Sequence, residues 1–522
     1  MNYADLFRVT LPETALEIAA LVVLVVDLAF LRKAALKVRV AVAALLGVAG
    51  CGAAYWTLQT SSGAGFSFDG ALLLAQGGYV AAAQSGILVL TALTLLLLID
   101  SVFTKHAGEY VAVVLMAAVG GLLIAAAQDL LVIFIGLELL SLGLYILTAF
   151  AKSSGKSAEA AMKYYLFGGM SAAFLLFGFS YLYGLSGSTN LAEIEQSIPV
   201  GAMPLLYVAW VLIVAGLGFK VAAVPFHLWA PDTYEGAPAP AAAFIASVSK
   251  VASFALLLNI CNGLFQPGRD WNGPPQLINE ILRNEFVIWQ PLLIILIVVA
   301  AASMVVGNLA ALAQVSVRRL LAYSAIAHAG YILLGVAVRH PYAGQVDTIH
   351  FVLDSFGPAH RSTEAVLYYI LTYGLTTIGA FGVVAVVERA TGSDKLDSFL
   401  GLHKRNPLLA AVLLVLFLSL AGIPPLVGFW AKFNLFAAVL GVSAGPVPFT
   451  LVALAVAFSA VSLYYYLQVL KRAYVMPAVD ESPIKVHPVT LAVLLLIAAA
   501  VVVLGCFPAL LQGWIESFYP VM

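Results

Sequence analysis

The sequence has few charged residues for its length. Aspartate, glutamate, lysine and arginine make up only 10% of the 522 residues, whereas 63% are hydrophobic and the mean hydropathy is +1.03. A soluble domain carries roughly 25% charged residues, because it must cover a surface that faces water. This chain cannot do so, and we therefore predict that most of it is embedded in lipid.

The chain also lacks the sequence signals of a metal site, of a nucleic-acid surface and of a cleaved leader. Cys51, Cys261 and Cys506 are far apart and form no CxxC or Cys/His spacing, so we expect no metal or iron–sulfur site. The net charge is −1 and no basic run exceeds a few residues, which excludes an extended nucleic-acid surface. The apolar run 16–31 is followed by Arg32 without a convincing cleavage site, so we interpret it as a retained membrane helix.

Long apolar runs occupy most of the chain. A helix needs about 20 apolar residues to cross the roughly 30 Å hydrocarbon core. We therefore predict an all-α membrane protein of about fourteen transmembrane helices, over residues 13–31, 40–58, 79–99, 108–127, 130–150, 162–184, 204–230, 240–262, 287–310, 320–338, 365–388, 407–438, 447–470 and 489–512. The two longest connections, 263–286 and 339–364, are expected to hold short helices or hairpins.

The predicted helices divide into four parts. Residues 1–107 form an N-terminal three-helix segment, 108–262 a first repeat, 263–475 a second repeat with its preceding loop, and 476–522 a C-terminal helix. The repeats comprise spans four to eight and spans nine to thirteen. Since five helices is an odd number, the second repeat is inverted relative to the first.

The seventh predicted span is too long for one straight crossing and contains Pro225, five residues after Lys220. Proline has no N–H and clashes with the carbonyl four residues earlier, here that of Val221. We expect the helix to be broken at this point, with a freed carbonyl beside the lysine.

The twelfth predicted span is interrupted in the same way. Pro424 and Pro425 free the carbonyls of Leu420 and Ala421, and Lys432 follows. Interrupted backbone inside a membrane persists only where protein or water satisfies it. Two broken helices at corresponding positions of two repeats are typical of transporters with a site at the membrane midplane.

Basic residues are distributed unequally between the two sides of the predicted bundle. With the N-terminus placed outside, sixteen of the 25 lysines and arginines fall in inside connections and four within spans. Five fall in outside connections, namely Arg8, Arg269, Arg283, Arg339 and Arg361. Because cytoplasmic connections carry the excess of positive charge, we predict that both termini face the outer, periplasmic side.

Five ionisable residues are predicted deep within spans: Glu138, Lys220, Lys250, His328 and Lys432. Such a side chain costs roughly 2.5–3.5 kcal/mol on insertion scales, so each needs a reason. Static ion pairs are one explanation, but three lysines against one glutamate are poorly balanced for that purpose. Lysine gives up its proton more readily than arginine, and no arginine is predicted deep in a span. The pattern favours proton transfer over a structural role.

His328 is included because of its neighbours. A single histidine on a helix is often only packed and hydrogen-bonded, but Ser324 lies one turn earlier on the same side and Tyr323 lies beside it. This polar stripe is able to hold water. Lys163 and Asp27 lie near span ends, where a side chain can reach the interface, and are not included.

Five segments together resemble one family of membrane proteins: GLELLSLGLYIL, AAMKYYLFGG, GLGFKVAAVPFHLWAPDTYEGAP, RRLLAYSAIAHAGYILLG and LAGIPPLVGFWAKF. They resemble the antiporter-like subunits of proton-pumping NADH:quinone oxidoreductase, the respiratory complex I, over about residues 100–475. Among these subunits the N type fits best. Lys432 stands where the M type has glutamate, the eighth span lacks a histidine-led stretch, and the long lateral helix of the L type is missing.

The resemblance implies roles for the buried residues. Glu138 and Lys220 would form an input pair, Lys250 a central relay and Lys432 an exit group, while His227 in the loop after the broken helix would be mainly structural. It also implies no cofactor in this subunit, because NADH, flavin, the iron–sulfur clusters and the quinone are bound by other subunits. The implied partners are the other membrane subunits and the lipid of the inner (plasma) membrane.

One alternative shares these features. Subunits of multi-subunit cation/proton antiporters are similar in fold and in their lysines, and they would need no NADH oxidation. A purely structural scaffold does not account for three deep lysines. The sequence therefore predicts proton carriage from its residues, and membership of complex I from the resemblance.

Overall fold

The computed structural model describes residues 3–61, 65–68, 71–101, 103–198, 203–263, 275–337, 356–442, 446–478 and 480–518, without the side chains of residues 3–4, 68, 195–196, 263, 275–290, 356–360 and 442. The expected contents of the connection 263–286 fall partly outside these residues, as does most of 339–364. Within the described part, a long helix already begins at Pro275, twelve residues before the predicted start of the ninth span.

The N-terminal segment is a helical layer with a small hairpin. It consists of α1 (Tyr3–Val9), α2 (Leu11–Val25), a π-helical turn (Val26–Phe30), α3 (Leu36–Ser61), the strands β1 (Gly65–Phe68) and β2 (Ala71–Ala75), and α4 (Gly78–Leu98). The two strands pair antiparallel. This hairpin was not expected from the sequence.

The two repeats follow in chain order. The first contains α5 (Ala107–Ala126), α6 (Leu130–Thr148), α7 (Gly155–Ser186), α8 (Leu191–Ser197), α9 (Met203–Val221), α10 (Trp229–Gly236), α11 (Ala239–Ala246) and α12 (Val248–Gly263). The second contains α13 (Pro275–Leu312), α14 (Val317–Ala337), α16 (Phe356–Thr391), the 3₁₀ turn η3 (Leu396–Phe399), α17 (Leu402–Arg405), α18 (Pro407–Ala421), α19 (Val427–Val442) and α20 (Pro446–Tyr474). The chain then forms α21 (Pro488–Cys506) and α22 (Ala509–Glu516).

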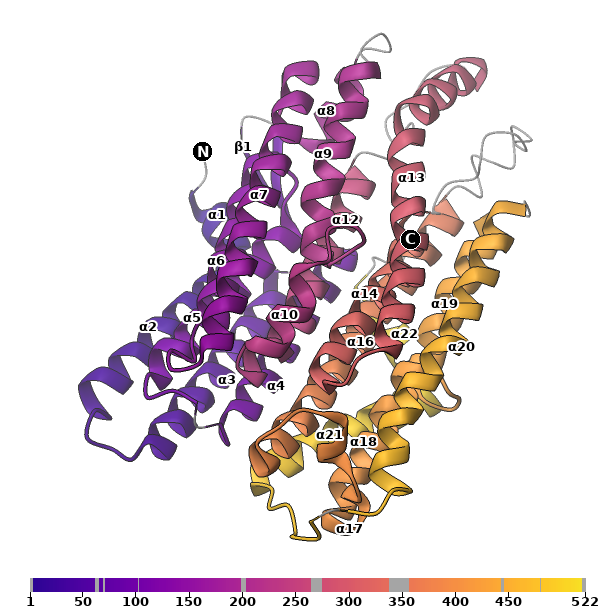
Figure 1. Ribbon diagram of the computed structural model, residues 1–522. Helices are drawn as coiled ribbons and strands as arrows, with labels where there is room; N and C mark the ends of the chain where they lie inside the picture. The colour runs from indigo at the N-terminus through magenta and orange to yellow at the C-terminus, as the bar shows by residue number, and fades with distance from the viewer. Residues whose placement is uncertain are drawn as a thin grey trace.

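The fold is that of an all-α membrane protein, as predicted. Twelve helices of the described part are long and apolar enough to cross a membrane. The pair α18 and α19 supplies one more crossing in two pieces, and α2 with its π-helical turn covers the first predicted span. Helices therefore occupy all fourteen predicted ranges, and twelve of them have by themselves the length and hydropathy of a membrane span. Figure 1 shows the N-terminal half of the bundle lying beside the C-terminal half.

Local sequence explains where several helices begin and end. Asp129 caps α6 by accepting from the N–H groups of Leu131 and Val132, and Asn406 caps α18 through the N–H of Leu409. Such caps satisfy the free N–H groups at the start of a helix. Gly187 ends α7 in the left-handed region with φ of +76°, which glycine adopts without a steric penalty.

Corresponding helices of the two repeats pack closely through glycine. A Cβ on Gly120 of α5 would lie 2.5 Å from the backbone nitrogen of Leu140 of α6. A Cβ on Gly330 of α14 would lie 2.7 Å from the carbonyl oxygen of Ala300 of α13. Small residues allow membrane helices to approach at this distance. The first two helices of each repeat therefore form similar tight pairs.

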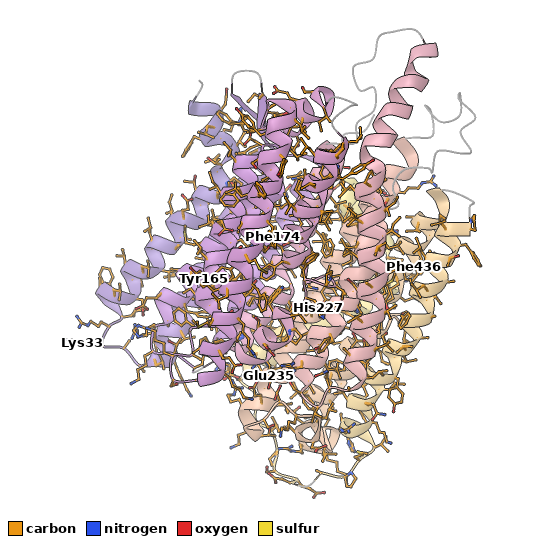
Figure 2. The ribbon with its side chains drawn as sticks, turned by 45° about the horizontal axis from the view of Figure 1, so that its top comes forward. Lys33, Tyr165, Phe174, His227, Glu235 and Phe436 are labelled. Carbon is orange, nitrogen blue, oxygen red and sulfur yellow. The ribbon has the colours of Figure 1, made fainter. Side chains whose placement is uncertain are left out.

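Both chain ends reach the same turn, between β2 and α4. Gln76 donates to the carbonyl of Val9, and the N–H of Gly78 donates to the carbonyl of Phe518 at 3.1 Å. The described ends of the chain therefore lie at one end of the bundle. Figure 2 shows Lys33 and Glu235, both in predicted inside connections, toward the opposite end.

Candidate functional site

Lys220 is the last residue but one of α9, at the predicted break. The chain leaves the helix through Ala222, a non-glycine residue with φ of +60°, and reaches Pro225 through a cis peptide bond. The side chain of Lys220 is only 8% exposed, and its Nζ donates to Ser141 Oγ at 2.6 Å. This hydrogen bond goes to a hydroxyl of α6.

Glu138 lies on α6, one turn before Ser141, and is partly buried. No ion pair of the described residues joins Glu138 to Lys220, and the lysine contacts Ser141, one turn further along the same helix, instead. The structure therefore brings Glu138 into the neighbourhood of Lys220 and places Ser141 in contact with the ammonium group. Ser141 was not identified from the sequence.

Lys250 also follows an interruption, which the sequence analysis missed. The eighth span is divided at Ser247, between α11 and α12, and Lys250 is three residues further on. Ser247 Oγ donates to the carbonyl of Ala243 at 2.6 Å, a bond from a serine to its own helix that often bends helices. Lys250 is 3% exposed, and its Nζ donates to the carbonyl of Ala325 on α14.

Lys432 is held at the break between α18 and α19. Its Nζ donates to the carbonyls of Leu420 and Ala421 at 3.1 and 2.9 Å, and to Ser459 Oγ of α20 at 2.8 Å. These are the two carbonyls that the prolines were expected to free. Gly422 ends α18 with φ of +89°, and a Cβ there would lie 3.0 Å from Lys432 Cδ. Glycine at this position therefore serves both the turn and the lysine.

The two breaks have the same local form. Ala222 and Gly422 are both left-handed, and each is followed by a cis X–Pro bond, to Pro225 and to Pro425. The lysines lie on opposite sides of these breaks, Lys220 before the first and Lys432 after the second. The repeats thus share their backbone design and differ in where the charge is placed.

His328 is at the centre of a group of tyrosines. Its Nδ1 is 2.8 Å from the hydroxyl of Tyr369 on α16, and its Nε2 is 3.4 Å from the hydroxyl of Tyr466 on α20. The Tyr466 hydroxyl is also hydrogen-bonded to Ser324. The polar stripe predicted for this helix is therefore present, and it is completed by hydroxyl groups from two other helices.

Aromatic rings connect Lys250 to Lys432 through His328. The ring of Tyr373 lies 5.8 Å from Lys250 Nζ and 4.8 Å from the His328 ring. The ring of Tyr331 lies 5.8 Å from the His328 ring and 5.5 Å from Lys432 Nζ. These distances permit attraction between the ammonium groups and the ring faces. The second half of the predicted row is thus contiguous in space, whereas Lys220 and Lys250 have separate partners.

A small cavity lies beside His328. It is lined by polar side chains of α16, Thr372 and Thr376, together with Ser419 of α18 and Gly428 of α19. Apart from Ser324 and Tyr323, these tyrosines and hydroxyl residues were not identified from the sequence. A usable signal was present, since Tyr368 and Tyr369 are adjacent and Tyr464, Tyr465 and Tyr466 are consecutive inside apolar spans.

Lys163 and Asp232 belong to an ion-pair network at the end of the bundle where Figure 2 shows Glu235. Lys163 and Arg319 each contact Asp232, and Arg319 also contacts Glu235 at 3.1 Å. Partial burial opposes ionisation of both carboxyls, but hydrogen bonds from the cations hold the pKa of Asp232 and the pKa of Glu235 below their usual values. The network joins α7, α10 and α14. Asp27 is likewise paired, with Arg39 at 2.6 Å.

His227 follows the broken helix and is 8% exposed. Its Nδ1 is buried without a hydrogen-bond partner among the described residues. The three cysteines are free thiols, two buried and one exposed. The described residues contain no group of three or more histidine, cysteine, aspartate or glutamate side chains placed to hold a metal ion.

Comparison with known proteins identifies the family. Residues 127–271 and 281–461 match the family described as "NADH:quinone oxidoreductase/Mrp antiporter, TM". The chain is 46% identical to "NADH-quinone oxidoreductase subunit N 2" of Acidobacterium capsulatum, covering 99% of both chains. It is 42% identical to "NADH-quinone oxidoreductase subunit N 1" of Roseiflexus castenholzii, covering 81% of this chain and 76% of that one.

Solved structures agree with this assignment. A chain of respiratory complex I from Thermus thermophilus with bound aureothin superposes with a TM-score of 0.74 at 31% identity, covering 96% of this chain and 98% of that one. A chain of the Mrp complex from Dietzia superposes with a TM-score of 0.76 at 20% identity, covering 100% and 98%, which shows a shared fold. The chain is a multi-pass membrane protein that belongs to the N-subunit family of NADH-quinone oxidoreductases, within the wider family that also includes Mrp antiporter subunits.

Proposed function

We propose that this chain is a proton-translocating subunit in the membrane arm of an NADH:quinone oxidoreductase. The observation that carries the proposal is that three buried lysines each lie at a helix interruption, which gives a charged group at membrane depth a set of polar partners. An ammonium group that is held by hydroxyls and carbonyls, and is free of a fixed carboxylate partner, is able to change its protonation state. A static ion pair would not need this arrangement.

The first step depends on the distance between Glu138 and Lys220. At about 4 Å and an effective dielectric of about 20, opposite charges attract by about 4 kcal/mol. This corresponds to roughly a thousandfold in proton affinity. Movement of Glu138 toward Lys220 would hold the proton on the lysine, and movement away would release it. Ser141, which contacts Lys220 Nζ, would keep the side chain in place during this change.

The later steps run through the contiguous part of the row. A proton released by Lys220 would pass through water to Lys250, and then past Tyr373 and His328 to Lys432. These groups interact, so their protonation belongs to the row as a whole and not to single residues. Neutral His328, with hydroxyls on both ring nitrogens, is able to accept a proton on one nitrogen and give one up from the other.

The redox chemistry belongs to other subunits in this proposal. NADH, flavin, iron–sulfur clusters and quinone would be bound elsewhere, this subunit would need no cofactor, and changes at the quinone site would reach Glu138 through neighbouring membrane subunits. The subunit would lie in the inner (plasma) membrane with both termini on the periplasmic side. The basic residues of the predicted inside connections and the common location of the two chain ends support this orientation.

The test uses the complete complex reconstituted in liposomes. Replacing Lys220 or Lys250 with alanine should abolish or sharply reduce the number of protons translocated per electron pair. A normal ratio in both variants would refute the assignment. Purification of the native complex distinguishes the antiporter alternative, because partners with flavin and iron–sulfur absorption are expected here, whereas a cation/proton antiporter would bring down only small membrane subunits.

A further inference from the structure

The N-terminal segment contains a buried acidic residue that is distant in sequence from the row of buried ionisable residues between Glu138 and Lys432. Glu13 of α2 is 4% exposed. Its Oε1 lies 3.5 Å from Nε2 of Gln84, a long hydrogen bond, and its Oε2 has no partner among the described residues. No ion pair of the described part includes Glu13. A buried carboxylate without a cation or a full set of donors is costly, so packing alone does not explain this residue.

The chain from residue 76 to residue 85 holds further unpartnered polar atoms. Oε1 of Gln84, Oε1 of Gln76 and the hydroxyl of Ser85 are buried and lack hydrogen-bond partners among the described residues. All three side chains are at most 5% exposed. Buried polar groups in proteins are almost always hydrogen-bonded, often to internal water. Through Gln84, Glu13 therefore contacts a buried polar stretch of the chain that begins at the turn where the two chain ends meet.

The amide groups in this region have a structural task that Glu13 does not share. Gln84 Nε2 donates to the carbonyl of Leu122 at 3.2 Å, and Asn259 Nδ2 donates to that of Ala125 at 2.6 Å. The Ala125 carbonyl is among the last four of α5, which have no donor within the helix. Asn259 in turn accepts from the hydroxyl of Tyr79 at 2.6 Å. These contacts occupy the amide donors, and the free oxygen of Glu13 takes part in none of them.

The helix that carries Lys250 holds a further unpartnered hydroxyl. Ser253 lies one turn beyond Lys250 on α12, is buried, and its hydroxyl has no partner among the described residues. A Cβ on Gly121 would lie 3.4 Å from Ala252 of α12 and 3.7 Å from Ile87 of α4, so these two residues lie at the same position along the axis of the bundle. Along this axis, Ser253 is therefore within about one helical turn of Ser85 and Gln84.

We propose that Glu13 is a proton-binding group on the outer side of the first repeat, connected to Lys250 through Ser253, Ser85 and Gln84. This inference rests on the proposed function, since it assigns a further step to proton carriage. A proton arriving from Lys250 would move through water between these polar groups and bind the free oxygen of Glu13. Its release outward would pass Gln76, whose amide donates to the carbonyl of Val9, a member of the small apolar cluster at this end of the bundle.

The test compares three variants in the reconstituted complex. Glu13→Gln keeps the shape of the side chain and removes the carboxyl group that binds and releases a proton, whereas Glu13→Asp shortens the side chain and keeps the carboxyl group. We expect Glu13→Gln to lower the number of protons translocated per electron pair, or the coupled turnover, at least fivefold, and Glu13→Asp to retain most of it. Glu17→Gln, one turn further along α2 at an exposed position, is the matched control and should behave as wild type.

The proton translocation of Glu13→Gln relative to that of Glu13→Asp decides the outcome. If Glu13→Gln pumps as well as Glu13→Asp, or if neither variant assembles, Glu13 is a packing residue and the inference is overturned. If Glu13→Gln alone fails to assemble, Glu13 has a structural role and the inference is likewise overturned. Lys250→Ala measured in parallel separates the two proposals. Loss of pumping in Lys250→Ala with normal pumping in Glu13→Gln refutes only the role of Glu13, whereas normal pumping in both refutes the proposed function as well.

Discussion

Replacing Lys250 with arginine separates a structural charge from a proton carrier. The ammonium group of Lys250 makes a hydrogen bond to the Ala325 carbonyl and lies 5.8 Å from the Tyr373 ring. A hydrogen bond from a charged group contributes about 1.5–3 kcal/mol, and a desolvated cation–π contact about 2 kcal/mol. The two contacts together are therefore worth about 4 kcal/mol, and an arginine is able to make both.

The two side chains differ in their ability to release the proton. The ordinary pKa values of arginine and lysine in water differ by at least about two units, so the neutral form of arginine is rarer by a factor of about 100 or more. If Lys250 carries protons, Lys250→Arg should reduce proton translocation by at least this factor. If Lys250 is only a fixed positive charge, the same variant should be close to wild type, because about 4 kcal/mol of contacts is retained.

The assay is proton translocation by the purified complex in liposomes, measured together with NADH oxidation. The amount of complex recovered is measured first, since arginine is larger than lysine. Lys471→Arg, at the exposed end of α20, controls for the exchange itself and should be neutral. Translocation above half of the wild-type value in Lys250→Arg would refute the proton-carrier reasoning for this residue.

Two further predictions concern the breaks and the ion-pair network. A Cβ on Gly428 would lie 1.8 Å from a backbone carbonyl oxygen of α18, so Gly428→Ala should destabilise the subunit by about 1–3 kcal/mol and reduce the amount of complex recovered. Gly184 has open space around it, and Gly184→Ala should leave the recovery unchanged. Equal recovery of the two variants would contradict the close packing at Gly428. Arg319→Gln removes a cation that holds the pKa of Asp232 and of Glu235 low. A carboxyl group whose pKa is lower in the folded protein stabilises the fold at pH values above its unfolded-state pKa of about 4, and this stabilisation is lost as the pH falls below that value. The variant should therefore unfold more easily than wild type at pH 7, by about 1 kcal/mol. The difference from wild type should shrink in acid. A pH-independent difference in thermal unfolding would count against this explanation.

The membrane character, the fourteen spans and the broken seventh and twelfth helices could be predicted from the sequence because each depends on local chemistry. A run of about 20 apolar residues and a proline inside a helix have the same consequence in almost any context. The partners of Lys432 are an example of such a local consequence. The carbonyls of Leu420 and Ala421, freed by Pro424 and Pro425, are the ones that receive its ammonium group.

The break before Lys250 could not be predicted in this way. Ser247 is neither proline nor glycine, and the interruption depends on how its hydroxyl bonds to Ala243 and how α11 and α12 pack against their neighbours. The β-hairpin was missed for a related reason. Its short strands are stabilised by contacts with the ends of α1, α4 and α5, which no local pattern reports.

The sequence by itself determined which residues are buried charges, since lysine or glutamate in an apolar run is visible at once. Only the tertiary structure decided what each charge meets. Ser141 reaches Lys220 across 79 residues, Ala325 reaches Lys250 across 75, and Tyr466 reaches His328 across 138. Contacts between helices so far apart in the chain follow from how the whole bundle packs. The row of lysines could therefore be identified from the sequence, whereas the hydroxyls, carbonyls and rings that surround the lysines could be identified only in the folded protein.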